Sequence, residues 1–328
     1  MRVIMFRLIV CTAATLLLAV PTASFGAAAQ IYPSKPVRVV IPWPAGGSND
    51  IVGRIVMQKL SAALGQQFVI DNRPGASGSI GANLVAKAPA DGYTLMVHST
   101  THVGNGTFYK NLPYDTLKDF VGVARLCSQP GALVVHPSLP VKTVKDFIAL
   151  AKARPGQIFY SSSGNGSGPH LWMAQLIELT GINIVHVPYR GGPPAVNALV
   201  SGETQVMLAS IATVIGHVRA GKLRMLGVAS GKRMEMFPNI PTIAEAGVPG
   251  YEMNAWVGVF VPAGAPEDII NRLNSEINQI LNLPDVQKVL SNGVLEPWPA
   301  TPDQFAAHIK ADYEKYAKLI KLTGARSE

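Results

Sequence analysis

The sequence predicts an α/β protein made of two doubly wound units, and three observations point to this class. The chain has 328 residues and is 48% hydrophobic, which is enough for two domains, each with its own core. Short β-branched runs alternate with amphipathic helical segments. Its 31 Gly and 25 Pro follow no fixed period, which excludes collagen and short-repeat solenoids. A charged fraction of 15% also argues against a disordered chain.

Residues 1–29 resemble an export signal rather than part of the fold. Arg2 and Arg7 precede an apolar run at residues 8–20, and Ala27-Ala28-Ala29 forms a small-residue cleavage site. The run is shorter than the ~20 residues that a membrane span needs. We therefore expect cleavage near Ala29 and a soluble, exported mature protein. The mature chain would keep 26 basic and 20 acidic residues, a net charge of +6.

The first series of elements alternates strand and helix. Residues 37–41 are a β-branched run, which is typical of a buried parallel strand. After Gly46-Gly47, apolar residues at helical spacing predict a helix that stops at Gly65. The elements expected next are a strand at 68–70, a helix at 80–88 and a strand at 93–98. This βαβαβ order predicts a parallel sheet.

A second series begins with a strand at residues 132–135. A helix over 143–152 follows, with Thr143 and Asp146 spaced as a capping box. Further strands are expected at 158–161, 184–187, 205–208 and 224–229, separated by helices that start near Gly168, Pro193 and Ile211. Residues 251–261 are expected to cross back to the first unit as a strand, and the last helix has Thr301 as its N-cap. The predicted domains are therefore 30–128 with 252–328, and 129–251.

The loops that lead from strands into helices contain the candidate binding residues. In a doubly wound sheet such loops meet at the carboxyl ends of the strands, so a ligand is expected between the two domains. Gly46 and Gly47 let the backbone approach a ligand closely. Free amides at a helix start favour an anion by ~0.3–1 kcal/mol. Equivalent loops lie at residues 72–81, 99–102, 161–170 and 187–193.

Other chemistries find little support in the sequence. It has no G-x-S-x-G elbow, phosphate-binding P-loop or H-E-x-x-H pair, and its seven histidines lack metal-ligand spacing. No G-x-G-x-x-G motif supports a dinucleotide, and the basic residues are too dispersed for nucleic acid. Ser167 and His170 are close in sequence but lack an acidic third member. We expect no enzyme activity, cofactor or metal; a secreted hydrolase remains the weaker alternative. Cys127 is expected to be a buried free thiol, because the mature chain has no second cysteine.

Several motifs together resemble one known family. They are Tyr32-Pro33-Ser34-Lys35-Pro36, Pro42-Trp43-Pro44-Ala45-Gly46-Gly47 with Asp50, Asn72-Arg73-Pro74-Gly75, Ala90-Asp91-Gly92-Tyr93, Val187-Pro188-Tyr189-Arg190-Gly191, Ala220-Gly221-Lys222-Leu223-Arg224 and Pro241-Thr242. In this order, from Tyr32 to about Leu322, they resemble the Bug family of periplasmic solute receptors, the substrate-binding components of tripartite tricarboxylate transporters.

The resemblance implies a type II periplasmic-binding-protein fold, with two α/β domains that close over a small carboxylate. It further implies a periplasmic monomer that delivers its ligand to integral-membrane permease subunits. Signalling to a membrane sensor is the alternative. In this family the carboxylate is held by backbone amides, hydroxyl groups and ordered water. Carried over to this chain, the ligand-binding residues are Trp43, Pro44, Ala45, Gly46, Gly47, Ser48, Thr100, Thr101, His102, Ser163, Gly164, Ser167, Tyr189, Arg190 and Ala209.

Two positions depart from the family's common pattern. Ser77 stands where Gly is usual, and Ala209 stands where some members carry Asp. Without that carboxylate a ligand ammonium group would lack a partner, so we expect a ligand that has none. Arg190 is expected either to contact the ligand or to form a structural ion pair.

Overall fold

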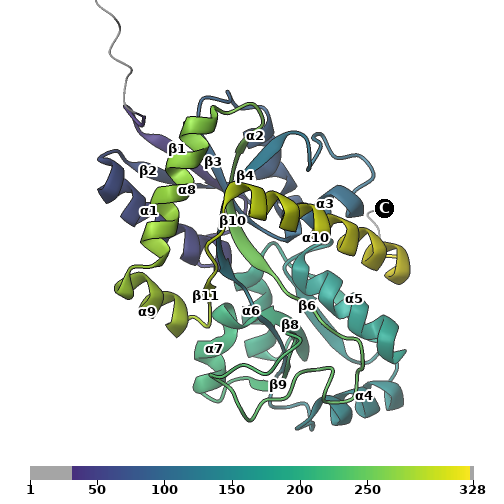
Figure 1. Cartoon of the computed structure of the whole chain (residues 1–328). Coiled ribbons are helices and arrows are strands. Elements are labelled where there is room, and N and C mark those ends of the chain that lie inside the picture. The colour runs from purple at the N-terminus through teal and green to yellow at the C-terminus, as the bar shows by residue number, and fades with distance from the viewer. Residues whose placement is uncertain (1–31, 326–328) are drawn as a thin grey trace, which may run out of the picture. The chain divides into compact units, whose positions relative to one another are not determined.

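The computed structural model describes residues 32–325, so the predicted export signal lies outside the described residues. The described chain contains two β-sheets with helices on their faces (Figure 1). Every strand of the first sheet comes from residues 37–128 or 256–297, and every strand of the second from residues 131–228. The chain therefore leaves the first sheet once and returns to it once. The predicted domain boundaries fall in these two crossings and remain a prediction.

The first sheet has six strands. They are β1 (Val37–Ile41), β2 (Phe68–Asn72), β3 (Thr94–Ser99), β4 (Phe120–Ser128), β10 (Trp256–Pro262) and β11 (Glu296–Pro297). Across the sheet they run in the order β11-β4-β10-β3-β1-β2. β1 is parallel to β2 and β3, as the βαβαβ pattern predicts, with Val39 opposite both Ile70 and Leu95. β10, the strand that was expected to cross back into this unit, is antiparallel to β3 and β4.

The second sheet has five strands in the order β7-β6-β8-β5-β9. They are β5 (Gly131–Val135), β6 (Phe159–Ser162), β7 (Val185–Pro188), β8 (Val206–Ser210) and β9 (Arg224–Val228). β6 is parallel to β7 and β8, whereas β5 is antiparallel to β8 and β9. Both sheets thus combine a parallel part with reversed strands, which are β10 and β11 in the first sheet and β5 in the second. β5 and β10 directly follow the two crossings.

The helices begin and end where the local sequence favours it. They are α1 (Ser48–Leu64), α2 (Ser79–Ala86) after a 3₁₀ turn at Ala76–Gly78, α3 (Thr101–Phe108), α4 (Val144–Ala153), α5 (Gly168–Thr180), α6 (Gly192–Ser201), α7 (Ile211–Arg219), α8 (Glu267–Leu281), α9 (Pro284–Asn292) and α10 (Pro302–Thr323). Gly65 ends α1 with φ +70°, a left-handed conformation that glycine adopts readily. The capping box predicted for α4, at Thr143 and Asp146, is confirmed, and Thr301, the predicted N-cap of α10, forms a second capping box with Gln304.

Neither β4 nor α3 was expected from the sequence. β4 lies next to the centre of the first sheet, but its apolar run is interrupted by Gly122 and Arg125. Arg125 is buried there because its guanidinium group stacks on the ring of Trp298, 3.3 Å from the ring centroid. α3 contains two glycines and three β-branched residues, which weaken helix propensity. It forms nevertheless, since tertiary contacts with α10 cover it.

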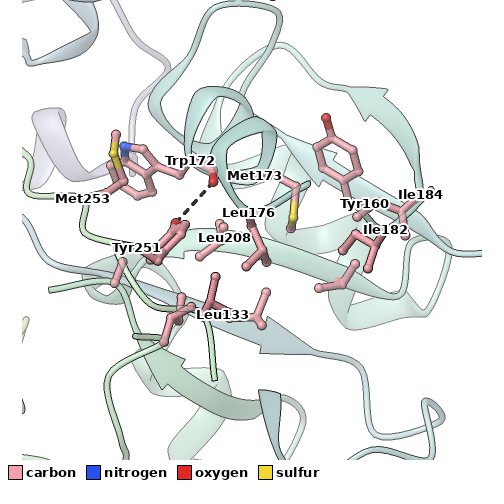
Figure 2. Close-up of a cluster of buried hydrophobic side chains, with 14 of the residues drawn as sticks. Leu133, Tyr160, Trp172, Met173, Leu176, Ile182, Ile184, Leu208, Tyr251 and Met253 are labelled. Carbon is pink, nitrogen blue, oxygen red and sulfur yellow. Dashed lines mark hydrogen bonds between the residues drawn. The ribbon is translucent and has the colours of Figure 1, made fainter. Parts of the chain in front are cut away.

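Helix α10 connects the two halves of the core. Its residues contact β4 of the first sheet, yet Tyr316, Leu319 and Ile320 belong to the same buried cluster as residues of β5, β8 and α5. Figure 2 shows the middle of that cluster, where Leu176 and Leu208 lie beside Tyr251, with Trp172 above them and Leu133 below. The C-terminal helix therefore packs against elements of both sheets.

Candidate ligand-binding site

A small cavity of about 50 Å³ lies where the loops after five strands meet. Its lining comes from both sheets and from the two crossings: Trp43, Pro44, Gly47, Ser48, Asn49, Ser99, Thr100, Thr101, Gln129, Ser163, Gly168, Pro169, Trp172, Gly192, Met207, Ser210, Thr213 and Ala255. At ~10–15 Å³ for each water molecule, the cavity has room for about three to five waters. It lies at the carboxyl ends of the strands, where doubly wound folds bind their ligands.

Five helices begin at this cavity. Residues at or beside the first turns of α1, α3, α5, α6 and α7 are part of its lining. None of these five helices has a side-chain cap hydrogen bond at its N-terminus. Their first-turn amides lack helical partners, and each helix dipole adds ~0.3–1 kcal/mol of attraction for negative charge. The cavity is therefore suited to bind an anion that is contacted by helix N-termini from both sheets.

The cavity wall carries no formal charge. Within residues 32–325, no Asp, Glu, Lys, Arg or His side chain is part of its lining. The polar groups are instead neutral hydroxyls and amides from Ser, Thr, Asn and Gln. Three buried polar atoms in this wall have no hydrogen-bond partner among the described residues: Asn49 Oδ1, Ser210 Oγ and Trp172 Nε1. Because an unpaired buried polar group costs ~1–3 kcal/mol, a bound ligand that supplies partners would remove this penalty.

Asp50 holds the loop that carries Pro44 and Gly47. Its carboxylate accepts hydrogen bonds from the amide of Gly46, from Arg54 Nε and from Asn72 Nδ2, each at 2.9 Å. Burial alone would raise the pKa of Asp50, but these three hydrogen bonds outweigh it and hold the pKa below its usual value. Asp50 does not itself reach the cavity; it fixes the backbone that does.

Trp43 is held by a buried histidine. Its indole Nε1 donates to His98 Nδ1 at 3.3 Å, and the amide of Ser99 donates to the same nitrogen at 2.8 Å. Because Nδ1 accepts both bonds, the proton of the neutral ring is on Nε2. Burial, reinforced by His102, lowers the pKa of His98 well below its usual value. The wall at Trp43 is thus supported by an uncharged ring.

Trp172 joins the cavity to the crossings. Its ring lies against Gly131 and Gly168, where an added Cβ would come within 2.7 and 3.1 Å of ring carbons. Its backbone carbonyl accepts a hydrogen bond from Tyr251 Oη at 3.2 Å (Figure 2). The two glycines leave space for the indole ring. Tyr251, in the second crossing, holds α5 in place through this hydrogen bond.

Seven predicted binding residues line the cavity: Trp43, Pro44, Gly47, Ser48, Thr100, Thr101 and Ser163. The other eight do not. Ala45 and Gly46 are exposed beside it, and Gly164 and Ser167 lie in the loop behind Ser163. Tyr189 Oη donates to Glu203 at 2.7 Å, and Arg190 is exposed. His102 and Ala209 are fully buried in core clusters.

His102 lies outside the cavity lining, and its contact with a ligand stays a prediction. Residue 102 is in α3, and its ring is directed into a cluster with Tyr114, Phe120 and Phe260. Burial lowers its pKa to about 3. A loop at residues 99–102 was expected to present all of its side chains to the cavity, whereas a helix presents only one face. Ala209 is likewise fully buried, in a cluster that includes Met207 and Ile211.

The cavity also contains residues that sequence reasoning missed. Gln129 and Ala255 belong to the crossings. Trp172 is the fifth residue of α5, and Thr213 is the third residue of α7. Gln129 and Ala255 lie outside the strand-to-helix loops, so the position of those loops in the sequence does not indicate them. Helical periodicity could have indicated Trp172, which lies four residues after Gly168.

The pairing that a serine hydrolase needs is not formed by Ser167 and His170. The amide of Gly166 donates to His170 Nδ1 at 3.1 Å, and Ser167 Oγ has no hydrogen-bond partner among the described residues. A nucleophilic serine requires a hydrogen bond to its base. In residues 32–325 there is also no cluster of three His, Cys, Asp or Glu side chains that could hold a metal ion. Likewise, no helix in this part of the chain has the length and hydropathy to cross a membrane.

Comparison with known proteins gives consistent matches. The family model described as tripartite tricarboxylate transporter family receptor matches residues 52–325. The protein BugT of Bordetella pertussis is 35% identical over 302 residues, which cover 91% of this chain and 92% of BugT. Among solved structures, R. palustris Rpa4515 with adipate has a TM-score of 0.87 and 36% identity, covering 90% of this chain and 99% of that one. MatC from Rhodopseudomonas palustris with bound malate has a TM-score of 0.84 and 30% identity, covering 88% and 100%.

Proposed function

The chain belongs to the tripartite tricarboxylate transporter receptor family, and from that premise we propose that it captures a small carboxylate in the cavity described above. Its fold is that of the type II periplasmic binding proteins. The family is one of solute receptors, not enzymes, which sets aside the hydrolase alternative. The observation that carries the proposal is the convergence of five helix N-termini on a cavity without charged side chains.

The ligand is a carboxylate without an ammonium group. Helix amides and hydroxyls supply donors for an anion, whereas no described carboxylate faces the cavity to receive a cation. Ala209, which stands where some family members carry Asp, is itself fully buried and outside the cavity lining. The relatives solved with adipate and malate support a ligand of this class. Amine-free dicarboxylates are therefore the first compounds to test.

Capture occurs by closure of the two sheet-bearing units, 30–128 with 252–328 and 129–251, over the ligand. Thr101 Oγ1 and the amide of Gly168, which come from the two units, lie 3.2 Å apart at the cavity wall. A ligand that contacts both walls stabilises the closed form in proportion to its preference for it. The loaded receptor then engages integral-membrane permease subunits in the periplasm, after removal of residues 1–29. The mature receptor is a monomer.

A thermal-shift screen tests the ligand class. The panel contains mono-, di- and tricarboxylates and the amino acids that correspond to them. A ligand at 100 times its Kd stabilises the folded state by about 2.7 kcal/mol, which is several degrees in Tm. Stabilisation by succinate, malate or adipate but not by aspartate or glutamate is expected. Stronger stabilisation by the amino acids would contradict the proposal.

The Thr101→Val variant tests the location. It removes a cavity hydroxyl and keeps the shape of the side chain, so the loss of a hydrogen bond to a charged ligand should weaken binding roughly tenfold or more. Thr107→Val is the matched control, because the Thr107 hydroxyl bonds to the Gly104 carbonyl at 3.0 Å within the same helix. Equal affinities for both variants would show that the ligand binds elsewhere.

A further inference from the structure

One backbone carbonyl joins the two units outside the cavity. The carbonyl oxygen of Asn165, in the loop between β6 and α5, accepts a hydrogen bond from Ser77 Oγ at 2.6 Å. It accepts a second one from Tyr109 Oη at 3.2 Å. Both donors follow elements of the first sheet, whereas the acceptor follows a strand of the second. A carbonyl has two lone pairs, so both bonds can form together.

The first-sheet side of this contact is built to present the Ser77 hydroxyl. Ser77 is buried, and its own carbonyl accepts a hydrogen bond from Asn105 Nδ2 at 2.9 Å. Ala76 and Ser77 have φ values of +44° and +49°, which non-glycine residues rarely adopt. Such strain is retained only where surrounding contacts impose it. Glycine would fit here without strain, so the serine side chain itself needs a reason.

The second-sheet side is equally specific. Asn165 lies between Gly164, with φ +120°, and Gly166, with φ +78°. An added Cβ on Gly164 would lie 3.3 Å from Ser77 Oγ, and one on Gly166 would lie 2.7 Å from a ring carbon of Phe108. The two glycines therefore allow the loop to approach the first-sheet residues closely enough for the Asn165 carbonyl to be shared.

We infer that Ser77 and Tyr109 form a latch that stabilises the closed form through the Asn165 carbonyl. The inference rests on the proposed closure. Neither residue lines the cavity, so both act as positioning residues: they bias closure without touching the ligand. Opening the units breaks both hydrogen bonds, whereas the hydrogen bond from Asn105 stays within the first unit.

The latch changes the ratio of closed to open receptor and the rate at which the ligand dissociates. Loss of one of these hydroxyls reduces the ratio of closed to open receptor by roughly two- to tenfold, the usual net effect of one hydrogen bond. The same factor appears in the Kd for any ligand that requires the closed form. Because the bonds form after the ligand has entered, the change falls mainly on the dissociation rate.

Four variants separate the latch from a purely structural role. Ser77→Gly removes the hydroxyl and relieves the backbone strain, whereas Ser77→Ala removes the hydroxyl and keeps the strain. Tyr109→Phe removes the second donor. Thr107→Val is the control, because it deletes a hydroxyl whose bond to Gly104 lies within the first unit. If Ser77 acts as a latch, Ser77→Gly and Ser77→Ala lower the ratio of closed to open receptor by the same factor, although their thermal stabilities differ.

The first measurement uses ligand-free protein and is independent of ligand identity. Spin labels at Lys87→Cys, the residue that follows α2, and at Asn197→Cys in α6 report the distance between the units. Both positions are exposed, and the remaining mature cysteine, Cys127, is buried. We expect the ratio of the short-distance population to the long-distance population to fall two- to tenfold in each latch variant. In Thr107→Val this ratio should stay unchanged. Identical distributions in wild type and all latch variants would overturn the latch.

The second measurement follows dissociation of adipate or malate by stopped flow. Faster release in the Ser77 and Tyr109 variants, with association unchanged, supports the latch. An unchanged release rate overturns it even if binding is confirmed. If the ligand-free distances shift while no carboxylate on the panel binds, the latch stands and the proposed ligand class fails. The two proposals can therefore fail separately.

Discussion

Replacement of Gly191 by alanine should block closure over the cavity while leaving each sheet intact. An added Cβ at Gly191 would lie 2.5 Å from Pro44 Cγ and 2.7 Å from Pro44 Cδ. Carbon atoms in contact prefer about 3.5–4.0 Å, so the two loops would have to separate by about 1 Å. Overpacking of this kind costs ~1–3 kcal/mol, which is roughly a five- to 150-fold increase in Kd for a ligand that requires closure.

The backbone conformation of Gly191 adds a second effect that must be separated from the first. Its φ is +114°, so alanine introduces local strain of ~1–3 kcal/mol. This strain is present in both the open and the closed form, so it lowers Tm but cancels from the Kd. The contact with Pro44 exists only in the closed form and therefore appears in the Kd.

A Pro44→Ala background distinguishes the two effects. It removes Cγ and Cδ and leaves Cβ, which is 3.7 Å from the added group, an ordinary contact. By calorimetric titration with a dicarboxylate, Gly191→Ala should bind weakly, and the double variant should bind like Pro44→Ala alone. A wild-type Kd for Gly191→Ala would show that the loops carrying Gly191 and Pro44 do not come this close together when the ligand binds. Weak binding in the double variant relative to Pro44→Ala would assign the loss to backbone strain instead.

Four further predictions follow from the same contacts. The Asp50→Asn variant should have a lower free energy of unfolding near neutral pH. A carboxylate with a lowered folded-state pKa contributes stability above its unfolded pKa of 3.8, and that contribution disappears as the pH falls through the folded-state pKa. The free energy of unfolding should therefore depend less on acid pH in the variant than in wild type. Urea unfolding from pH 7 to pH 2 checks this, and parallel curves for wild type and variant would contradict it. Native Cys127 should not react with a thiol reagent at pH 8, because burial raises its pKa to about 12; rapid native labelling would show that the strand opens. Arg190→Met should keep the wild-type Kd within about twofold, since Arg190 is exposed and outside the cavity; loss of binding would restore it as a ligand contact. Trp172→Phe should weaken ligand binding several-fold by removing the unpaired Nε1–H, and unchanged binding would show that this donor does not reach the ligand.

The elements with regular local signals were predictable from the sequence. The run at residues 37–41 matches β1 residue for residue, and α1 ends at the predicted glycine. Both capping boxes occur where Thr is followed three residues later by Asp or Gln. These features depend on neighbouring residues alone, so periodicity and capping rules describe them.

The missed features depend on partners distant in sequence. Arg125 lies in a buried strand only because Trp298, far along the chain, covers it. α3 forms against α10, and it is this helix that turns His102 into the core. Gln129 and Ala255 reach the cavity because the chain crosses between the sheets there. Local rules identified the loops around the cavity but could not indicate which side of each loop faces it.

The position of β10 in the first sheet also constrains the order in which the chain folds. β3 and β4 are consecutive in sequence, yet each pairs with β10, which lies between them. Residues 37–128 alone therefore leave a gap in the middle of their sheet, and unpaired strand edges flank it. The strands of the second sheet come from one continuous stretch, residues 131–228. During synthesis the second sheet can consequently assemble first, whereas the gap between β3 and β4 stays open until residue 262 has emerged. A chain organised in this way remains only partly folded until most of it has been made, so its N-terminal strands depend on residues that are synthesised more than a hundred positions later.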